Sequence, residues 1–330
     1  MKKNIALVTG GYSGESAISY KSAITIENHL DRGKYQVFMI DINTNAWQYV
    51  KENRELGEVD KNDFSIQWNG EKIKFDAVLI AIHGTPGEDG KLQGYFDMLK
   101  IPYTGCNAAT SALTMNKSYI TGVAGKAGIN VAKSVLLFKH SPISTSEILQ
   151  QLKLPLFVKP NNGGSSIGMS KVLKEEDLQM AIDNAFCEDS QVLVEEMIEG
   201  REFTIGVYKS KGTITTLPIT EVKAHMDKDF FDYEAKYEGK SSEITPAQIE
   251  ESIAEKIRAA ARKIYNIFNC RGVIRIDFIY NEKNGLPYML EVNTIPGQSA
   301  ASIIPQQVAA AGGNLKDFYS SLVEECLDVS

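Results

Sequence analysis

The sequence contains few cysteines, and their spacing fits neither a zinc site nor a disulfide framework. The 330 residues include four cysteines and no C-x-x-C pair; they are Cys106, Cys187, Cys270 and Cys326. Structural zinc sites need closely spaced ligands, and small disulfide-bonded domains need a denser set of cysteines. Four isolated cysteines are typical of reduced thiols in a cytoplasmic protein.

The sequence also lacks a hydrophobic run of about 20 residues, the length that a membrane-spanning helix needs. Its first residues, MKKNIALVTGG, resemble the start of a signal peptide because two lysines precede an apolar run. That run breaks at Thr9-Gly10-Gly11, however, and no small-residue cleavage site is present. We therefore expect a cytoplasmic protein without a membrane partner.

The sequence also has fewer basic than acidic residues. Lysine and arginine total 35, aspartate and glutamate total 42, and the formal net charge is −7. Proteins that bind nucleic acids usually carry a basic surface, so a nucleic acid is not expected as the main partner. A local basic pocket for a phosphorylated small molecule remains compatible with this balance.

What the chain does have is enough length and apolar content, with 43% hydrophobic residues, for two or three domains. Apolar segments at 5–8, 37–42 and 77–82 read as strands, and 15–30 reads as a helix. Alternation of this kind predicts an α/β domain in which helices cover a parallel sheet. We expect this first domain to end near residues 102–107.

The remainder of the chain mixes strand pairs with helices, which predicts an α+β fold. Segments 273–280 and 288–292 read as strands joined by the turn NEKNG, so they predict a hairpin. The stretch 221–246 is charged, contains aromatic residues and shows no periodicity. Loops of that length are usually functional. We therefore expect a lid that becomes ordered over a bound nucleotide.

The predicted hairpin gathers polar side chains on one face. Residues two apart on a strand share a face, so Glu291 and Asn293 point together, as do Arg275 and Asp277. Two carboxylates and an amide oxygen suit magnesium, with water and substrate phosphates completing the shell. An ordinary ion pair in which Arg275 neutralises the acids is an equally open interpretation.

Two further segments indicate nucleotide binding. KPNNGGSS, which begins with Lys159, places glycines and hydroxyl residues between two strands, where backbone N–H groups can face phosphate oxygens. It is not a P-loop, and a simple turn is the alternative. In VEEMIEGRE, which ends at Glu202, a strand runs into an acidic connector that could bind a purine edge and ribose hydroxyls. Taken alone, that connector would be a solvated linker.

Nine segments, in order over nearly the whole chain, resemble the D-alanine–D-alanine ligases of the ATP-grasp superfamily. They are GGYSGESAIS (10–19), HGTPGEDGKLQG (83–94), PYTG (102–105), MNK (115–117), VKPNNGGSSIGMSKV (158–172), VEEMIEGREFT (194–204), FDYEAKY (231–237), RIDF (275–278) and LEVNTIPG (290–297). The resemblance implies a three-domain ATP-grasp architecture with an N-terminal parallel-sheet domain. The expected division is an α/β substrate domain at 1–106, a central domain at 107–195 and a C-terminal domain with the metal site at 196–330.

The activity implied by the resemblance is the ATP-dependent joining of two D-alanines to D-alanyl-D-alanine, with release of ADP and phosphate. An acyl phosphate is the expected intermediate, and synthesis of peptidoglycan precursors is the expected purpose. The implied cofactors are ATP and two Mg²⁺ ions, with Mn²⁺ as an alternative. The implied partners are D-alanine and a second copy of the chain in a homodimer.

The resemblance also implies roles for individual residues. The metal ligands would be Asp277, Glu291 and Asn293. The nucleotide would be bound by Lys117, Lys159 and Lys236 at its phosphates, by Glu195, Glu196 and Ile198 at adenine, and by Glu202 at ribose. The first D-alanine would be held by Glu15, with Ser165 and Tyr237 beside it and His83 nearby. Arg275 and the Gly297 N–H would face the oxyanion, and Ser302 would face the carboxylate of the second substrate.

Several alternatives remain open at this point. Residues 298–302 read QSAAS where relatives read close to MTxxS, and Ser302 still falls at the serine position. Glu15 could be only a helix N-terminal acid, and His83 could be structural. A D-alanine–D-lactate ligase, another ATP-grasp carboxylate–amine ligase and a nucleotide-binding regulator without turnover are rival functions. Tyr237 argues against D-lactate, because ligases that favour the hydroxy acid tend to carry phenylalanine there.

Overall fold

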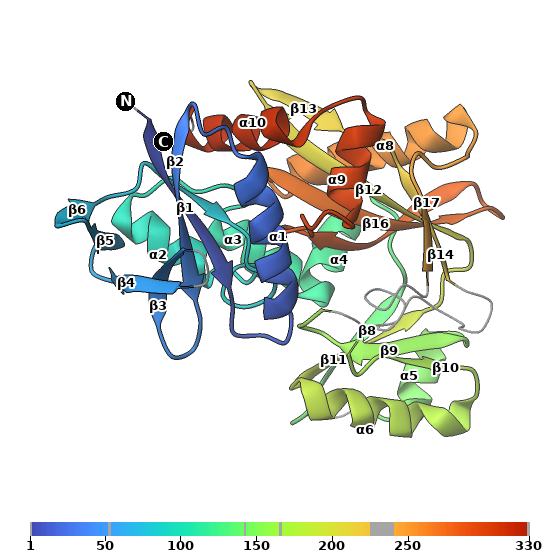
Figure 1. Cartoon of the computed structure of the whole chain (residues 1–330). Coiled ribbons are helices and arrows are strands. Elements are labelled where there is room, and N and C mark those ends of the chain that lie inside the picture. Colours follow the sequence, from blue (N-terminus) through green and yellow to red (C-terminus); the bar gives the residue numbers. More distant parts are fainter. Residues whose placement is uncertain (1, 52–53, 142, 165–166, 225–240, 329–330) are drawn as a thin grey trace.

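Three sheets organise the chain. The computed structural model describes residues 2–51, 54–141, 143–164, 167–224 and 241–328. In Figure 1 the N-terminal sheet (blue) and the C-terminal sheet (yellow to red) lie beside each other, and the smaller central sheet (green) lies below the latter. The fold is mixed α/β with a partly parallel N-terminal sheet, as the sequence predicts.

The N-terminal sheet has seven strands in the order β6-β5-β4-β3-β2-β1-β7. The predicted strands are confirmed: β1 pairs in parallel with both β2 and β7. The antiparallel extension β3 to β6 was not predicted. The elements are β1 (Lys3–Gly10), α1 (Ser16–His29), β2 (Tyr35–Ile42), β3 (Trp47–Lys51), β4 (Arg54–Asp60), β5 (Ser65–Trp68), β6 (Glu71–Ile73), β7 (Ala77–Ile80) and α2 (Lys91–Leu99).

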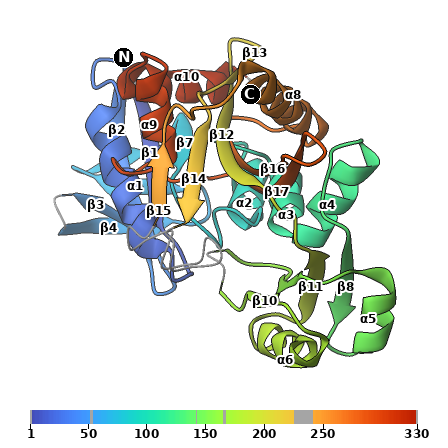
Figure 2. The same cartoon turned by 90° about the vertical axis from the view of Figure 1, so that its right-hand side faces the viewer.

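The central sheet is antiparallel throughout, in the order β10-β9-β11-β8. Its apolar face packs against α5 and α6, as Figure 2 shows. Local signals start the helix α5, because Ser144 and Glu147 form a reciprocal capping box there. The elements are β8 (Ser134–Phe138), α5 (Thr145–Gln151), β9 (Leu156–Pro160), β10 (Ser170–Val172), the 3₁₀ helix η1 (Glu175–Asp177), α6 (Leu178–Glu188) and β11 (Gln191–Glu196).

The C-terminal sheet contains β15-β14-β12-β16-β17, with β13 paired to β12. One apolar face is covered by α8, whose buried side chains recur at helical spacing. The predicted hairpin of β16 and β17 is confirmed. The elements are β12 (Arg201–Ser210), β13 (Thr213–Thr216), β14 (Thr220–Ala224), β15 (Ser241–Ile244), α8 (Glu251–Ile267), β16 (Val273–Asn281), β17 (Leu286–Asn293), α9 (Ile303–Ala310) and α10 (Leu315–Asp328).

The described ends of the stretch 221–246 correct the expectation of one continuous loop. β14 and β15 pair in antiparallel register, from Glu221 with Ile244 to Ala224 with Ser241. These short strands are polar on their exposed side, so they show too little alternation to be recognised in the sequence. Residues 225–240, on which the lid prediction depends, lie outside the described residues.

The connecting segments join the sheets into one assembly. The helices α3 (Ala108–Met115) and α4 (Lys117–Lys126) follow the N-terminal sheet, and α4 contributes Ile120 and Ala124 to the C-terminal core. The last helix, α10, returns to pack on the N-terminal sheet. Within the part of the chain described here, no helix is both long and apolar enough to cross a membrane.

Candidate active site

A cavity of about 950 Å³ lies where the three sheets meet. Its lining comes from β9 and β11 of the central sheet, from β12, β14, β16 and β17 of the C-terminal sheet, and from the loops at 13–15 and 84–85 of the N-terminal part. A cavity of this size can hold a nucleotide together with a smaller substrate. Many of the residues singled out in the sequence line it: Glu15, Lys117, Lys159, Glu195, Glu196, Ile198, Glu202, Asp277 and Glu291.

The polar cluster predicted on the β16–β17 hairpin is present. Asp277 lies opposite Glu291 in the strand register, and Arg275 lies opposite Asn293. Asp277 is 7% exposed. The Asn293 Nδ2 group donates to Asp277 Oδ2 at 3.2 Å and to Glu291 Oε1 at 3.5 Å. Thr204, which the sequence did not point out, donates from the facing strand β12 to Asp277 Oδ1.

The ion pair left open as the alternative is also present. Arg275 binds both carboxylate oxygens of Asp277, with Nε to Oδ1 at 2.9 Å and the terminal nitrogen to Oδ2 at 2.8 Å. This two-pronged pairing fixes the orientation of the carboxylate. It also holds the guanidinium next to Asp277, which lines the cavity.

The donor set fits a hard cation that is shared with a substrate. No group of three or more acidic, histidine or cysteine side chains that could hold a metal occurs among the described residues. Asp277 and Glu291 therefore provide two carboxylates, and phosphate oxygens or water must complete an octahedral shell. To add the amide oxygen of Asn293, its side chain has to turn over, because its nitrogen now faces both acids.

Lysines line the opposite side of the cavity. Lys159 Nζ lies 2.5 Å from Glu195 Oε1, and both side chains are largely buried. Lys117 donates to the carbonyl of Gly163, at 2.5 Å, in the glycine-rich loop. The two predicted phosphate contacts thus face the cavity, but Lys159 contacts Glu195 rather than a separate group. A phosphate that reaches Lys159 has to compete with this carboxylate.

The connector after β11 borders the cavity with both apolar and polar groups. Two of its N–H groups are already used, since Glu196 donates to Lys133 O at 2.9 Å and Met197 to Pro155 O at 3.0 Å. Ile198 contributes to the lining of the cavity. A planar base could pack against such apolar side chains while hydrogen-bonding to remaining backbone groups of the connector.

An ion-pair cluster at the same end of the cavity was missed in the sequence. Glu221 is buried, accepts from Arg201 Nε at 2.8 Å and lies 3.5 Å from Lys223 Nζ. Arg201 and Glu221 lie 20 residues apart on neighbouring strands. The only sequence signal was an acid at the start of a short polar strand, which is too common to single out.

Glu15 reaches the cavity from the N-terminal part. It occupies the N-cap position of α1 without a side-chain capping hydrogen bond, so simple capping does not explain it. A methyl group added at Gly84 would lie 3.0 Å from its Oε2 atom, and one at Gly164 would lie 3.3 Å from Oε1. The carboxylate therefore lies where loops from two different sheets approach each other.

Glu88 is a second acid near this junction, and the sequence interpretation missed it although it lies in the motif HGTPGEDG. It accepts hydrogen bonds from Gly84 N at 2.7 Å and from Ile295 N at 3.3 Å. The residue is half-buried, and desolvation of its carboxyl group, helped by the charge of Glu15, raises the pKa of Glu88 to about 8. It connects the N-terminal part to the turn that follows β17.

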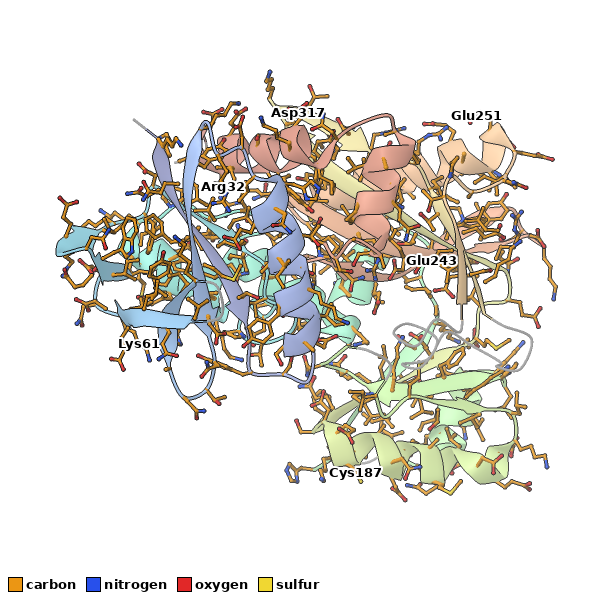
Figure 3. All side chains as sticks on the ribbon, viewed as in Figure 1. Arg32, Lys61, Cys187, Glu243, Glu251 and Asp317 are labelled. Atoms are coloured by element: carbon orange, nitrogen blue, oxygen red, sulfur yellow. The ribbon has the colours of Figure 1, made fainter. Side chains whose placement is uncertain are left out.

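Glu243 on β15, labelled in Figure 3, is a third acid outside the predicted set. It accepts from Gln306 Nε2 at 3.0 Å. Burial raises its pKa, while the positive charge of Arg275 acts in the opposite direction. Arg275 is therefore within the electrostatic reach of acids from both β15 and its own strand.

The remaining predicted residues lie beside the cavity or outside the described chain. His83, Arg275, Asn293, Gly297 and Ser302 are not among its lining residues. Gly297 and Ser302 do lie together, because a methyl group at Gly297 would approach Ser302 Oγ to 2.8 Å. His83 borders a small cavity behind the turn, where burial lowers its pKa. Ser165, Lys236 and Tyr237 lie outside the described residues.

Comparison with known families gives two matches that together span most of the chain. The family described as D-ala D-ala ligase N-terminus matches residues 4–106. The family described as D-ala D-ala ligase C-terminus matches residues 123–324.

Individual relatives agree with these matches. The chain is 47% identical to a D-alanine–D-alanine ligase of Flavobacterium johnsoniae over 98% of both chains. It is 44% identical to one of Phocaeicola vulgatus, over 98% of this chain and 99% of the relative.

Solved structures are similar in fold over the full length. The VanG D-Ala:D-Ser ligase of Enterococcus faecalis superimposes with a TM-score of 0.88 at 31% identity, covering 99% of this chain and 100% of that one. A D-alanine–D-alanine ligase of Bacillus anthracis complexed with ATP gives a TM-score of 0.79 at 28% identity, covering 99% and 98%.

Proposed function

Because the chain belongs to the D-alanine–D-alanine ligase family, whose members are ATP-dependent ligases, we propose that it joins two D-alanine molecules to D-alanyl-D-alanine. The dipeptide serves peptidoglycan synthesis. The observation that carries this proposal is the single cavity in which lysines, paired carboxylates and Glu15 from three sheets converge. Such an arrangement can hold a nucleotide, a divalent cation and an amino acid together.

The order of events follows from the chemistry of a carboxylate, which resists attack by an amine. ATP phosphorylates the carboxylate of the first D-alanine, so an acyl phosphate and ADP form. The amine of the second D-alanine then attacks the acyl carbon, and phosphate leaves. Negative charge develops first on phosphoryl oxygens and then on the oxygen of a tetrahedral carbon.

The lysine side of the cavity serves the nucleotide. Lys117 and Lys159 would hold its phosphates, together with Lys236, and the connector Glu195, Glu196 and Ile198 would border adenine. Glu202 would accept the ribose hydroxyls. Magnesium held by Asp277, Glu291 and Asn293 would neutralise charge on the phosphoryl oxygens.

The N-terminal part and the turn after β17 serve the amino acids. Glu15 would bind the ammonium group of the first D-alanine, with Ser165, Tyr237 and His83 near it. Arg275 and the Gly297 N–H would stabilise the oxyanion, since fixed donors at developing charge are among the strongest contributors to catalysis. Ser302 would bind the carboxylate of the second D-alanine.

We also propose a cytoplasmic homodimer and the three-part division at residues 106 and 195. The absence of a membrane-crossing helix from the described residues is compatible with a cytoplasmic location. Size-exclusion chromatography with light scattering measures the oligomeric state directly, and a monomeric mass at working concentration would contradict the dimer.

The decisive experiment incubates purified protein with ATP, Mg²⁺ and D-alanine and separates the products. We expect D-alanyl-D-alanine and one phosphate per dipeptide, and no product after chelation of the metal. D-Serine and D-lactate are tested as alternative acceptors across pH, because one structural relative is a D-Ala:D-Ser ligase. Nucleotide binding without phosphate release would instead indicate a regulator.

A further inference from the structure

A chain of buried hydrogen bonds runs behind the turn that carries Gly297. It connects Tyr319 on α10, Gln298 in the turn, Ser22 on α1 and His83 after β7. All four side chains are buried, and a small cavity adjoins them. The four residues come from parts of the chain that are far apart in sequence, so the network exists only when the N- and C-terminal parts are docked.

Gln298 is the centre of this network. The Tyr319 hydroxyl donates to Gln298 Oε1 at 3.1 Å, and Gln298 Nε2 donates to the carbonyl of Pro296 at 3.2 Å. The main-chain N–H of Gln298 donates to Ser22 Oγ at 3.1 Å. Its side-chain oxygen, side-chain nitrogen and backbone nitrogen therefore all have partners in the interior.

The bonds of Ser22 extend the network to His83. Ser22 Oγ lies 3.0 Å from His83 Nε2 and accepts from the Gln298 N–H, so this one hydroxyl links both residues. The Ile295 backbone also hydrogen-bonds to His83, and it donates to Glu88. The turn is thus held at Ile295, Pro296 and Gln298.

Gly297 lies between two of these fixed residues. Because the Pro296 carbonyl and the Gln298 N–H are both engaged, the peptide units on either side of Gly297 have little freedom to rotate. The close approach of Gly297 to Ser302 adds a third restriction. The direction of the Gly297 N–H is consequently determined from behind, by residues that do not line the main cavity.

We propose that Gln298 is a positioning residue: by binding Tyr319, Pro296 and Ser22 it holds the Gly297 N–H and Ser302 in the geometry that the reaction requires. This inference rests on the roles proposed above for Gly297 and Ser302. A displacement of about 1 Å in a reacting group can cost about 10²-fold in rate. Loss of the network should therefore lower turnover although no substrate contact is removed.

The first test is Gln298→Leu, which keeps an uncharged side chain of similar volume but can neither accept from Tyr319 nor donate to Pro296. We expect kcat to fall on the order of tenfold, while KM for ATP changes less than about twofold, because the nucleotide is bound on the other side of the cavity. An unchanged kcat, or an equal rise in KM for ATP, would overturn the proposal.

A double-mutant cycle tests whether Gln298 and Tyr319 act as one unit. Tyr319→Phe removes only the hydroxyl and should lower kcat by about threefold, whereas adding it to Gln298→Leu should lower kcat no further. Independent, multiplying losses would contradict the network. If Gln298→Leu fails to fold, Tyr319→Phe alone decides, since full activity of that variant would also overturn the inference.

Tyr265→Phe is the matched control for lost stability. Its hydroxyl is also buried and donates at 2.8 Å to the carbonyl of Gly272, a residue outside the turn at 294–302. We expect a similar fall in Tm with unchanged kcat; an equal loss of kcat here would reduce Gln298 to a general stability role. Absence of dipeptide from the unmodified protein would overturn the proposed function, whereas an active protein with active variants would overturn only the positioning role.

Discussion

The hairpin β16–β17 and the turn at 294–302 that follows it differ in the partners that stabilise their buried polar groups. On the hairpin, the Asp277 carboxylate is bound by a guanidinium, a hydroxyl and an amide. Behind the turn, Glu88 accepts from two backbone N–H groups, and desolvation, helped by the charge of Glu15, raises its pKa to about 8. The hairpin, at the front of this segment, carries charged groups that can bind a cation and phosphates. The network behind the turn, at the back, is held by hydrogen bonds and carries little charge.

This difference shows how one stretch of chain can supply charged catalytic groups and still hold its backbone in a fixed position. Buried charges are tolerated where partners or ligands neutralise them, and elsewhere neutral hydrogen bonds are the less costly way to fix a backbone. Mutations on the two sides should therefore fail in different ways. Mutations on the hairpin should abolish the reaction. Mutations behind the turn should alter stability, the pH dependence of stability, or the position of the groups in the turn.

The largest effect is expected for the carboxylates of the hairpin. Asp277→Asn and Glu291→Gln should each lower kcat on the order of 10³-fold or more, because each removes a metal ligand that serves the phosphoryl transfer. Turnover is measured as dipeptide formation, and circular dichroism with thermal unfolding verifies the fold. Since Asp277→Asn also leaves Arg275 without its carboxylate, Glu291→Gln is the cleaner variant. Retained activity in both would remove the metal assignment.

The next effect separates two roles for Arg275. If the guanidinium stabilises an oxyanion, Arg275→Met should lower kcat about 10²- to 10³-fold with little change in KM for ATP. If it only neutralises Asp277, the variant should bind Mg²⁺ more tightly and remain active. Magnesium titration of both proteins, followed by steady-state kinetics at saturating metal, distinguishes these outcomes.

The hairpin was predictable and the back of the turn was not, for a physical reason. The two-residue period of a strand is enough to place Glu291 and Asn293 on one face of β17, and Arg275 and Asp277 on one face of β16. Ile295 and Glu88 are separated by 207 positions in the sequence, and Gln298 and Ser22 by 276 positions. Their contacts depend on how the N- and C-terminal parts dock, for which a single sequence holds no periodic signal.

The N-terminal sheet shows a similar limit. Its parallel strands are continuous apolar runs and were predicted, whereas β5 and β6 are short and partly polar. They meet at Asn69-Gly70, both with positive φ, which is a hairpin signal that could have been used. Asp277 and Glu291 lie on strands that the sequence identified and face each other there, whereas acids such as Glu221 on short polar strands were missed.

A third, moderate effect concerns pH and the back of the turn. The pKa of Glu88 is raised in the folded protein to about 8, so the folded state holds this proton more tightly than the unfolded chain. Its contribution to the free energy of unfolding is complete below the ordinary glutamate pKa and is lost as pH rises through about 8. Glu88→Gln should therefore make the decline in stability between pH 5 and pH 8 shallower.

Urea unfolding of both proteins at intervals across that range measures the slope. Glu71→Gln, a change at an exposed glutamate on β6, is the control and should leave the slope as it is. If the Glu88→Gln variant keeps the full slope of the unmodified protein, the carboxyl group of Glu88 does not titrate as its desolvation requires.

The smallest effect compares one buried hydroxyl on each side. Thr204→Val removes the donor to Asp277, and Ser19→Ala removes the hydroxyl that accepts from His83 N at 3.0 Å. Each should cost about 1–3 kcal/mol of stability, the range for a buried group left without its partner. Only Thr204→Val should also raise the Mg²⁺ concentration needed for half-maximal activity, by a few-fold, because it alone releases a metal ligand from its fixed orientation. Equal metal dependence in the two variants would mean that the loss of the hydroxyl that binds Asp277 affects the metal site no more than the loss of a hydroxyl behind the turn. The hairpin and the turn would then not differ in function.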